Sequence, residues 1–218
     1  ITQNALAYFS YPSITTKRFI HSLGTMHLSS FMFKNALLNA DKKTKNNFLS
    51  ISKKAILKII KEENLNIHIE ELEYFDNKAL YQFTIPTKSK SQRATYTLLL
   101  QTMRIVALLH DVGHLPFSHQ VEYALKKVYN KIKTKEENKE ALLEKEFTFK
   151  ENYEEITKNC KDVLHEAIGE NLLELLFDYE LDELVFKTQE KDYLKLIKKL
   201  SLLILEEITY EDFDFKVL

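Results

Sequence analysis

Cysteine, glycine, proline and tryptophan are all scarce in this 218-residue chain, which has one cysteine, three glycines, three prolines and no tryptophan. The single cysteine, Cys160, excludes an internal disulfide and a cysteine-based zinc site, and it favours a cytoplasmic protein. The chain contains neither a Gly-rich phosphate loop nor a His-Glu-x-x-His motif. No apolar run approaches the roughly 20 residues needed to cross a bilayer, so we expect no membrane partner.

The chain also lacks a marked excess of either charge, because 31 basic residues nearly balance 32 acidic ones. A protein that binds nucleic acid needs clustered cations to neutralise phosphates, so nucleic acid is not expected as the main partner. The hydrophobic fraction of 44% is ordinary for a globular protein. A chain of this length can bury the core of one domain.

Helical periodicity dominates what is present. Apolar residues recur every three to four positions, which is typical of amphipathic helices, and this spacing predicts helices at residues 18–40, 46–63, 91–112, 118–132, 153–177 and 190–208. Residues 133–152 are rich in Lys and Glu and read as a mobile loop or an exposed helix. Only residues 66–86 alternate as strands do. We therefore expect an all-α fold with at most a short hairpin in that segment.

All three glycines, Gly24, Gly113 and Gly169, lie close in sequence to candidate site histidines. A chain so sparing of glycine is expected to keep it where the backbone bends or another group approaches closely. Gly113 is expected to end the helix that carries His110, which is the usual role of glycine after a last turn. Gly24 and Gly169 fit either a close approach or tight helix packing.

Imidazoles and a carboxylate gather where the third predicted helix stops. His110 and Asp111 are adjacent, and His114 and His119 follow within the same short stretch. Imidazole nitrogen and carboxylate oxygen together suit a first-row divalent metal. Far upstream, His21 lies within a second distinctive stretch, Arg-Phe-Ile-His-Ser-Leu-Gly.

These two stretches resemble the motifs of the HD-domain metal-dependent phosphohydrolases. The pairing of Arg-Phe-x-His-Ser-Leu-Gly with His-Asp-x-Gly-His-x-Pro-Phe-Ser-His is similar to the deoxynucleoside triphosphate triphosphohydrolase branch. Gln3, the Tyr11-Pro12 pair and the His165-Glu166 pair resemble further features of that branch. The resemblance implies an HD-domain helical bundle over residues 1–218, incomplete at both ends. It also implies that residues 42–90 are an insertion, because the family joins its two motifs by a shorter connection.

The resemblance also implies a role for each matching residue. The metal ligands would be His21, His110 and Asp111. The substrate contacts would be Arg18, as a clamp on phosphate oxygens, and Gln3. The proton-handling residues would be His114, His119, Glu122 and His165, with Glu122 at the position where the family commonly has Asp. His27 and His68 lie outside the motifs and are expected to be structural.

The family's fourth metal ligand is not identified by the sequence. The family supplies it as a late Asp accompanied by a Tyr and an Arg, but no arginine follows Arg104 in this chain. Asp178 and Asp192 are each followed by a tyrosine. The late aspartates that could serve are Asp178, Asp182, Asp192, Asp212 and Asp214.

The function implied is hydrolysis of deoxynucleoside triphosphates to nucleoside and triphosphate, with one divalent metal ion: Mn, Fe, Ni, Zn or Mg. The expected partners are a nucleotide or another phosphorylated small molecule and, as is common in the family, further copies of the chain. Two alternatives stay open. The fold could act on another phosphorylated metabolite, such as a nucleoside monophosphate, or it could be a non-catalytic sensor or scaffold with an incomplete site.

Overall fold

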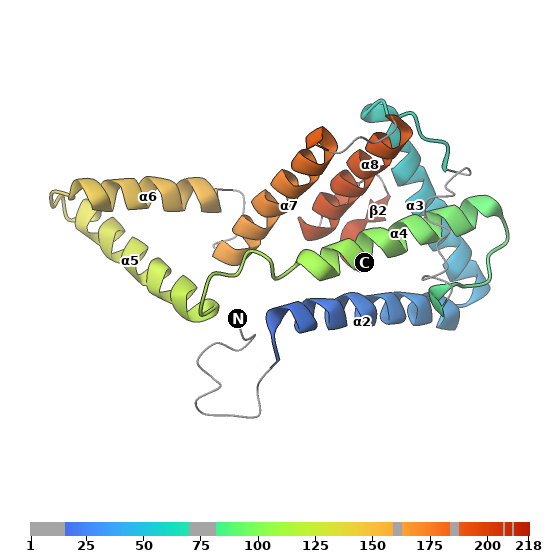
Figure 1. Ribbon diagram of the computed structural model, residues 1–218, viewed down its shortest axis with the longest axis horizontal. Coiled ribbons are helices and arrows are strands. Elements are labelled where there is room, and N and C mark those ends of the chain that lie inside the picture. The colour runs from blue at the N-terminus through green and yellow to red at the C-terminus, as the bar shows by residue number, and fades with distance from the viewer. Residues whose placement is uncertain (1–15, 70–81, 159–162, 184–187, 207, 211) are drawn as a thin grey trace. The chain divides into compact units, whose positions relative to one another are not determined.

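The computed structural model describes residues 16–69, 82–158, 163–183, 188–206, 208–210 and 212–218, and in them the chain is all-α, as predicted (Figure 1). The helices are α2 (Arg18–Asn39), α3 (Lys42–Glu62), α4 (Lys90–Leu109), α5 (His119–Glu137), α6 (Glu144–Thr157), α7 (Leu164–Glu183) and α8 (Thr188–Leu205). A two-stranded antiparallel sheet, β1 (Thr209–Tyr210) with β2 (Phe213–Asp214), and the short helix η4 (Phe215–Val217) follow them. None of the helices described is both long and apolar enough to cross a bilayer.

The chain divides into two compact units. The first unit comprises Ile1–Ser22 and Leu109–Leu172, and the second comprises Leu23–Leu108 and Leu173–Leu218. Helices α2, α4 and α7 therefore contribute residues to both units, α4 only through Leu109. The single HD domain and the insertion at residues 42–90 both stay predictions.

The second unit holds a core of aliphatic and aromatic side chains. Phe33 of α2 stacks on Tyr96 of α4 with ring centres 5.3 Å apart, and Phe48 of α3 meets Phe213 of β2 edge-on at 5.5 Å. The fully buried aliphatic side chains of this unit include Ile56, Leu98, Leu99, Leu196 and Leu200. Leu196 and Leu200 of α8 are four residues apart, as the helical repeat predicts, whereas Leu98 and Leu99 are adjacent in α4.

The hairpin expected within residues 66–86 is not found in the parts of that segment that the structure describes, which contain no strand. The alternation that suggested it is real, since Ile67, Ile69, Phe83 and Ile85 are all buried. In the described parts the backbone hydrogen-bonds to side chains instead of a neighbouring strand. The strands lie instead at Thr209–Asp214.

Three hydrogen bonds show this pairing in the irregular segment. The Asn66 backbone N–H donates to the Asp192 carboxylate at 3.0 Å. Lys34 Nζ donates to the carbonyl oxygen of Gln82 at 2.7 Å, and the Tyr96 hydroxyl donates to the carbonyl oxygen of Phe83. Period-two burial therefore arises here without a β-ladder, because side chains of the surrounding helices satisfy the backbone.

Several predicted helix boundaries move for identifiable local reasons. Helix α3 begins at Lys42, earlier than predicted, because the Asp41 carboxylate accepts the N–H groups of Lys43 and Thr44 at 2.8 and 3.0 Å. Helix α4 ends at Leu109, before the predicted end at residue 112. The helix predicted at residues 153–177 is two helices, α6 and α7.

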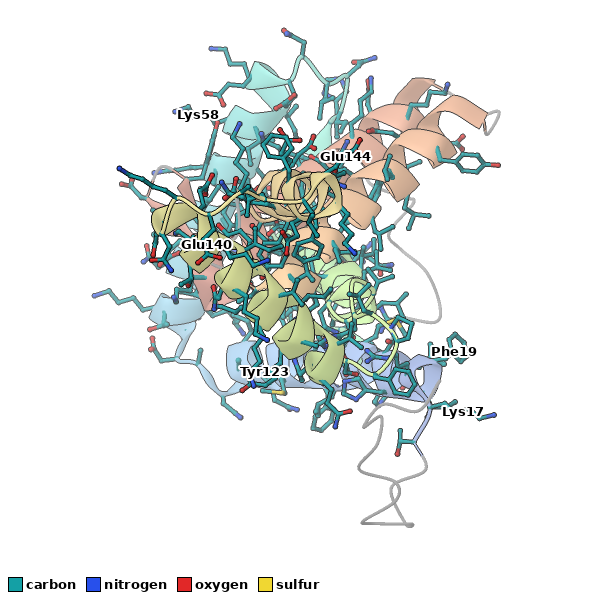
Figure 2. All side chains as sticks on the ribbon, turned by 90° about the vertical axis from the view of Figure 1, so that its left-hand side faces the viewer. Lys17, Phe19, Lys58, Tyr123, Glu140 and Glu144 are labelled. Atoms are coloured by element: carbon teal, nitrogen blue, oxygen red, sulfur yellow. The ribbon has the colours of Figure 1, made fainter. Side chains whose placement is uncertain are left out.

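Helices α5 and α6 pair within the first unit. Together they make most of residues 133–152 helical. Tyr129 stacks on Tyr153 with ring centres 4.6 Å apart. Lys135 Nζ lies 2.7 Å from Glu146 Oε1, and Glu146 also accepts the backbone N–H of Leu143 at the start of α6. Figure 2 labels Tyr123 near the start of α5 and Glu144 at the start of α6.

Candidate metal centre

His21, His110 and Asp111 converge within the first unit. His21 lies in the first turn of α2, and His110 and Asp111 lie in the turn that follows α4. His21 Nε2 is 3.3 Å from Asp111 Oδ2, and His110 Nε2 is 3.3 Å from Asp111 Oδ1. Each of the three residues can offer one ligand atom such that these atoms all lie within 4.8 Å of one another.

These separations fit the ligand set of one transition-metal ion. Bonds of about 2.1 Å from a metal place neighbouring ligand atoms about 3.0–3.4 Å apart, between octahedral and tetrahedral angles. The two imidazole–carboxylate distances fall in this range. The side chains of His21 and His110 are each about a third exposed, which leaves this group open to a ligand from solvent. Together the residues can hold a divalent cation.

The local geometry of His110 and Asp111 differs from the expected one. They were expected on the last turn of a helix, where successive side chains point about 100° apart. The helix instead ends at Leu109, and the Val112 N–H donates to the Leu109 carbonyl oxygen at 2.9 Å to form a turn. The two side chains therefore converge because of the conformation of this turn, not because of helical spacing.

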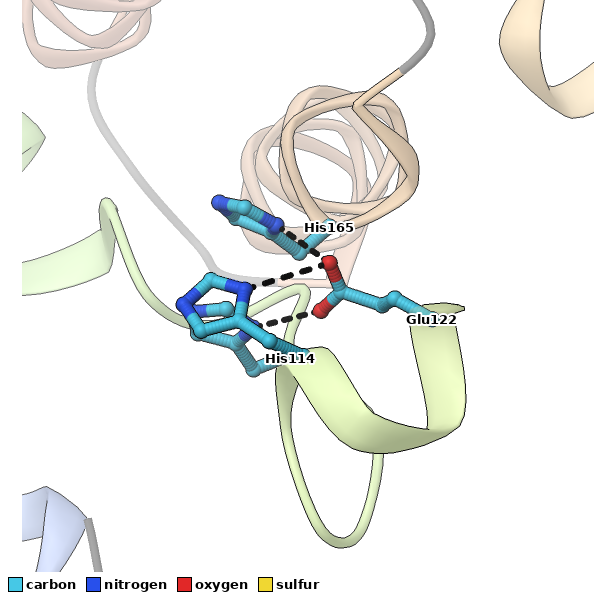
Figure 3. Close-up of side chains that lie close together, drawn as sticks. His114, Glu122 and His165 are labelled. Atoms are coloured by element: carbon cyan, nitrogen blue, oxygen red, sulfur yellow. Dashed lines mark hydrogen bonds and ion pairs between the residues drawn. The ribbon is translucent and has the colours of Figure 1, made fainter. Parts of the chain in front are cut away.

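A second group of titratable side chains lies beside the first: His114, His119, Glu122 and His165. His114 Nδ1 is 2.7 Å from Glu122 Oε1, and His165 Nδ1 is 2.8 Å from Glu122 Oε2, as the dashed lines in Figure 3 show. His119 Nδ1 lies 3.5 Å from the same Oε2. One carboxylate therefore faces three imidazoles, which come from the turn before α5, from α5 itself and from α7.

His114 connects the two groups. Its Nδ1 meets Glu122, and its Nε2 lies 3.5 Å from Asp111 Oδ1. Its side chain is only 5% exposed, so it cannot reorient freely into solvent. Metal candidates and proton-handling candidates are thus joined through one buried imidazole.

Burial and hydrogen bonding act in opposition on the pKa values in this network. Burial lowers the pKa of His114, and its hydrogen bond with Glu122 opposes that effect without overcoming it. Burial alone would raise the pKa of Glu122, but hydrogen bonds with His165 and His114 outweigh it, so this pKa lies below its ordinary value. Glu122 therefore carries its negative charge at neutral pH, while His114 favours its neutral form.

Gly113 serves a close approach and does not end a helix in the left-handed conformation. No glycine in the part of the chain described has a positive φ angle. A Cβ atom added to Gly113 would lie 2.0 Å from the carbonyl oxygen of His165 and 2.4 Å from the backbone nitrogen of Gly169. The expected helix-ending role was wrong, because the residue is needed where the turn carrying His110 touches the start of α7.

Arg18 lies against the loop that precedes α5. Its Nη2 donates to the Ser118 hydroxyl, while its Nε and Nη1 are buried and have no hydrogen-bond partner among the described residues. Phe117 and Ser118 both adopt positive φ angles, 66° and 52°. Such conformations cost about 1–3 kcal/mol for residues other than glycine, so neighbouring contacts must hold them. The Arg18–Ser118 hydrogen bond is one such contact.

The structure thus brings together most of the predicted site residues. His21, His110, Asp111, His114, His119, Glu122 and His165 form the two groups, and Arg18 contacts Ser118 in the same unit. Gln3 lies outside the described residues. Ser118 was not predicted to contribute. The only sequence signal for it was its place inside the longer motif.

The late aspartates all belong to the second unit. Three of the candidates have partners in the second unit. Asp178 pairs with Lys198 at 2.7 Å, and Asp192 accepts the Asn66 N–H. Asp214 accepts the Lys216 N–H at the start of η4. Asp212 is exposed, and the side chain of Asp182 lies outside the described ones.

Comparisons with models of known protein families, with curated proteins and with solved structures find no match to this chain.

Proposed function

We propose that this chain is a metal-dependent phosphohydrolase of the HD-domain type, most similar to the deoxynucleoside triphosphate triphosphohydrolases. The observation that carries the proposal is the contact between two groups with different chemistry. In the first group, two imidazoles and the Asp111 carboxylate form a possible ligand set. Asp111 contacts His114, and in the second group the Glu122 carboxylate holds the imidazoles of His114 and His165. Metal-assisted hydrolysis can use both kinds of group side by side, the first to hold the ion and the second to move protons.

The ligand set would be His21, His110 and Asp111. A divalent ion bound there would polarise a phosphoryl oxygen and lower the pKa of a bound water. Asp111 offers one oxygen toward each histidine, so its carboxylate orients both imidazoles. The partial exposure of both imidazoles leaves room for substrate and water to approach.

The proton-handling group would be His114 and His165 with Glu122. A carboxylate that accepts a hydrogen bond from an imidazole orients the ring and increases its basicity. Hydrolysis breaks the bond between the α-phosphorus and the nucleoside 5′ oxygen and forms a bond from phosphorus to a water oxygen. A proton must leave the water and another must reach the departing 5′ oxygen. Imidazoles whose Nδ1 atoms are held by Glu122 are suited to both transfers.

Arg18 would hold the phosphates. Two of its guanidinium nitrogens, Nε and Nη1, have no hydrogen-bond partner among the described residues, although both are buried. Each of these nitrogens can donate a charge-assisted hydrogen bond to a phosphate oxygen. The hydrogen bond from Nη2 to Ser118 fixes the side chain in place beforehand. Lysine could not replace it, because an ammonium lacks the planar fork.

A different phosphorylated substrate is the second candidate. In the triphosphohydrolases a late Asp, with a Tyr and an Arg, holds the nucleotide, and this chain lacks that arginine. Asp178 and Asp192 instead engage Lys198 and Asn66. A smaller substrate, such as a nucleoside monophosphate, would not need that arginine.

The test is a hydrolysis assay on the purified chain, with metal content measured on the same samples. A pool of deoxynucleoside triphosphates and, separately, of monophosphates is offered with Mn²⁺, Ni²⁺, Zn²⁺ or Mg²⁺. The proposal expects turnover that Asp111→Ala abolishes together with metal binding. The matched control is His68→Ala, since His68 is exposed and outside both groups.

Three outcomes separate the candidates. Release of triphosphate supports the first, and release of phosphate from monophosphates supports the second. Metal binding without hydrolysis of either pool contradicts both and leaves the fold as a sensor or scaffold.

A further inference from the structure

We infer that His114, His119, Glu122 and His165 form a second divalent-cation site, separate from the one at Asp111, and that zinc is the ion it suits best. The inference goes beyond the proposed function, which calls for one metal ion. It depends on ligand geometry alone, so it holds whether or not the chain hydrolyses nucleotides.

The ligand atoms already surround one position. Each of the four residues can offer an atom such that all of them lie within 4.8 Å of one another. The Nδ1 atoms of His114, His165 and His119 are 2.7, 2.8 and 3.5 Å from the nearest oxygen of Glu122. Zinc bonds of about 2.0–2.1 Å require neighbouring ligand atoms to be roughly 3.4 Å apart. The three distances to Glu122 differ from that value by about 0.7 Å or less.

The orientations of the three imidazole rings also support a cation site. His114 and His165 stack with centres 3.9 Å apart and an angle of 22° between their planes, and both turn Nδ1 toward Glu122 (Figure 3). His119 meets His114 edge-on, at 4.6 Å and 86°. His114 and His165 thus each direct Nδ1 at one oxygen of the same carboxylate, and His119 approaches that carboxylate in a different ring plane.

The burial of the group suits a metal site with three fixed ligands and one movable ligand. The side chains of His114, Glu122 and His165 are 5, 12 and 16% exposed, whereas that of His119 is 74% exposed. An ion can therefore enter from the His119 side, and His119 can close over it. Three ligands held in place beforehand reduce the ordering cost of binding.

The donor set selects the ion. Three imidazoles and one carboxylate favour zinc among common divalent cations, while Mg²⁺ and Ca²⁺ prefer all-oxygen ligands. Four protein ligands would leave little room for water, unlike the more open group at His21. A zinc ion here would also occupy the nitrogen atoms that the proposed hydrolysis needs for proton transfer. If the proposed function holds, excess zinc is therefore an inhibitor.

The experiment counts zinc ions on the full chain. The protein is stripped with a chelator and titrated with Zn²⁺ against a chromophoric competitor, and circular dichroism confirms that each variant is folded. We expect about two ions per chain. His119→Ala and Glu122→Gln should each weaken one of them by roughly tenfold or more, since even residues that only orient ligands are worth about 10–100-fold in metal affinity.

Matched variants identify which ion is affected. Asp111→Ala should remove the other ion and leave the second site filled, and His68→Ala should retain both. The exposed His119 is the safest substitution, because it contributes little to the core. Either a single ion that Asp111→Ala removes and Glu122→Gln leaves in place, or two ions that are both lost in Asp111→Ala, overturns the inference. Neither result depends on whether nucleotides are hydrolysed.

Discussion

Gly113 controls how closely the turn bearing His110 and Asp111 can approach α7. Its backbone touches the His165 carbonyl and Gly169, and a single methyl group would collide with both. Glycine is therefore required here for space, since its φ angle is not in the left-handed region. The residue before His114 thereby lies against the backbone of His165.

Gly113→Ala should destabilise the fold by about 1–3 kcal/mol, because an added group in a packed contact forces backbone shifts. It should also weaken the stacking of His165 on His114, and any hydrolysis should fall with it. Thermal unfolding measures the first effect. Gly24→Ala is the control: nothing lies within 4 Å of its added Cβ, so this helical substitution should be neutral or stabilise by about 0.5–1 kcal/mol. Equal effects of the two substitutions would contradict this account of Gly113.

Glu122 is the other residue on which the site depends, since its carboxylate accepts hydrogen bonds from His114 and His165 at once. Glu122→Gln removes the charge and one acceptor but keeps the shape. We expect turnover to fall by about 10²–10⁴-fold, the usual worth of positioned proton transfer. Metal at His21, His110 and Asp111 should stay bound. A variant that turns over normally would exclude Glu122 from proton handling.

At the scale of elements, the irregular segment after residue 81 is held by helix α4. The Tyr96 hydroxyl donates to the carbonyl oxygen of Phe83, and Phe83 is itself buried. Burial raises the pKa of Tyr96 well above its ordinary value, so the hydroxyl stays protonated and remains a donor.

Tyr96→Phe should therefore lower the free energy of unfolding by about 1–3 kcal/mol, because it leaves a buried carbonyl without a partner. Chemical denaturation measures this. Tyr123→Phe is the matched control, since Tyr123 is 62% exposed on α5, and its effect should stay within about 0.5 kcal/mol. If neither substitution changes the free energy of unfolding, the hydrogen bond contributes nothing to stability.

Most helices could be predicted from the sequence, whereas the strands could not. Helices α3 and α8 follow the apolar repeat because that repeat is also their pattern of burial. Helix α2 forms as well, although Phe19 and Phe31 of its apolar repeat are exposed. Residues 66–69 and 82–85 imitate a strand, because alternate side chains are buried while the backbone bonds to Tyr96, Lys34 and Asp192. Hydrogen bonds to residues this distant in the chain leave no pattern in the local sequence. The strands near Tyr210 are only two residues each, too short for alternation to show.

At the scale of the whole molecule, every residue proposed for chemistry that the structure describes belongs to the first unit. The motifs predicted His21, His110 and Asp111 as neighbours, and the distances confirm that they lie together. The convergence of His119 and His165 on Glu122 could not be read from spacing, because α5 and α7 are separated by α6. The contact between Arg18 and Ser118 depends on two positive φ angles that sequence does not reveal.

The central claim is that this first unit hydrolyses phosphorylated nucleotides with a metal bound at Asp111. Phosphorus NMR of a mixed deoxynucleoside triphosphate pool, incubated with the metal-loaded chain, tests it most directly because it identifies the product. The account predicts the signals of free triphosphate, growing with time and absent when Asp111→Ala replaces the unaltered chain. A spectrum unchanged with Mn²⁺, Ni²⁺, Zn²⁺ and Mg²⁺ alike, for triphosphates and monophosphates, would contradict it.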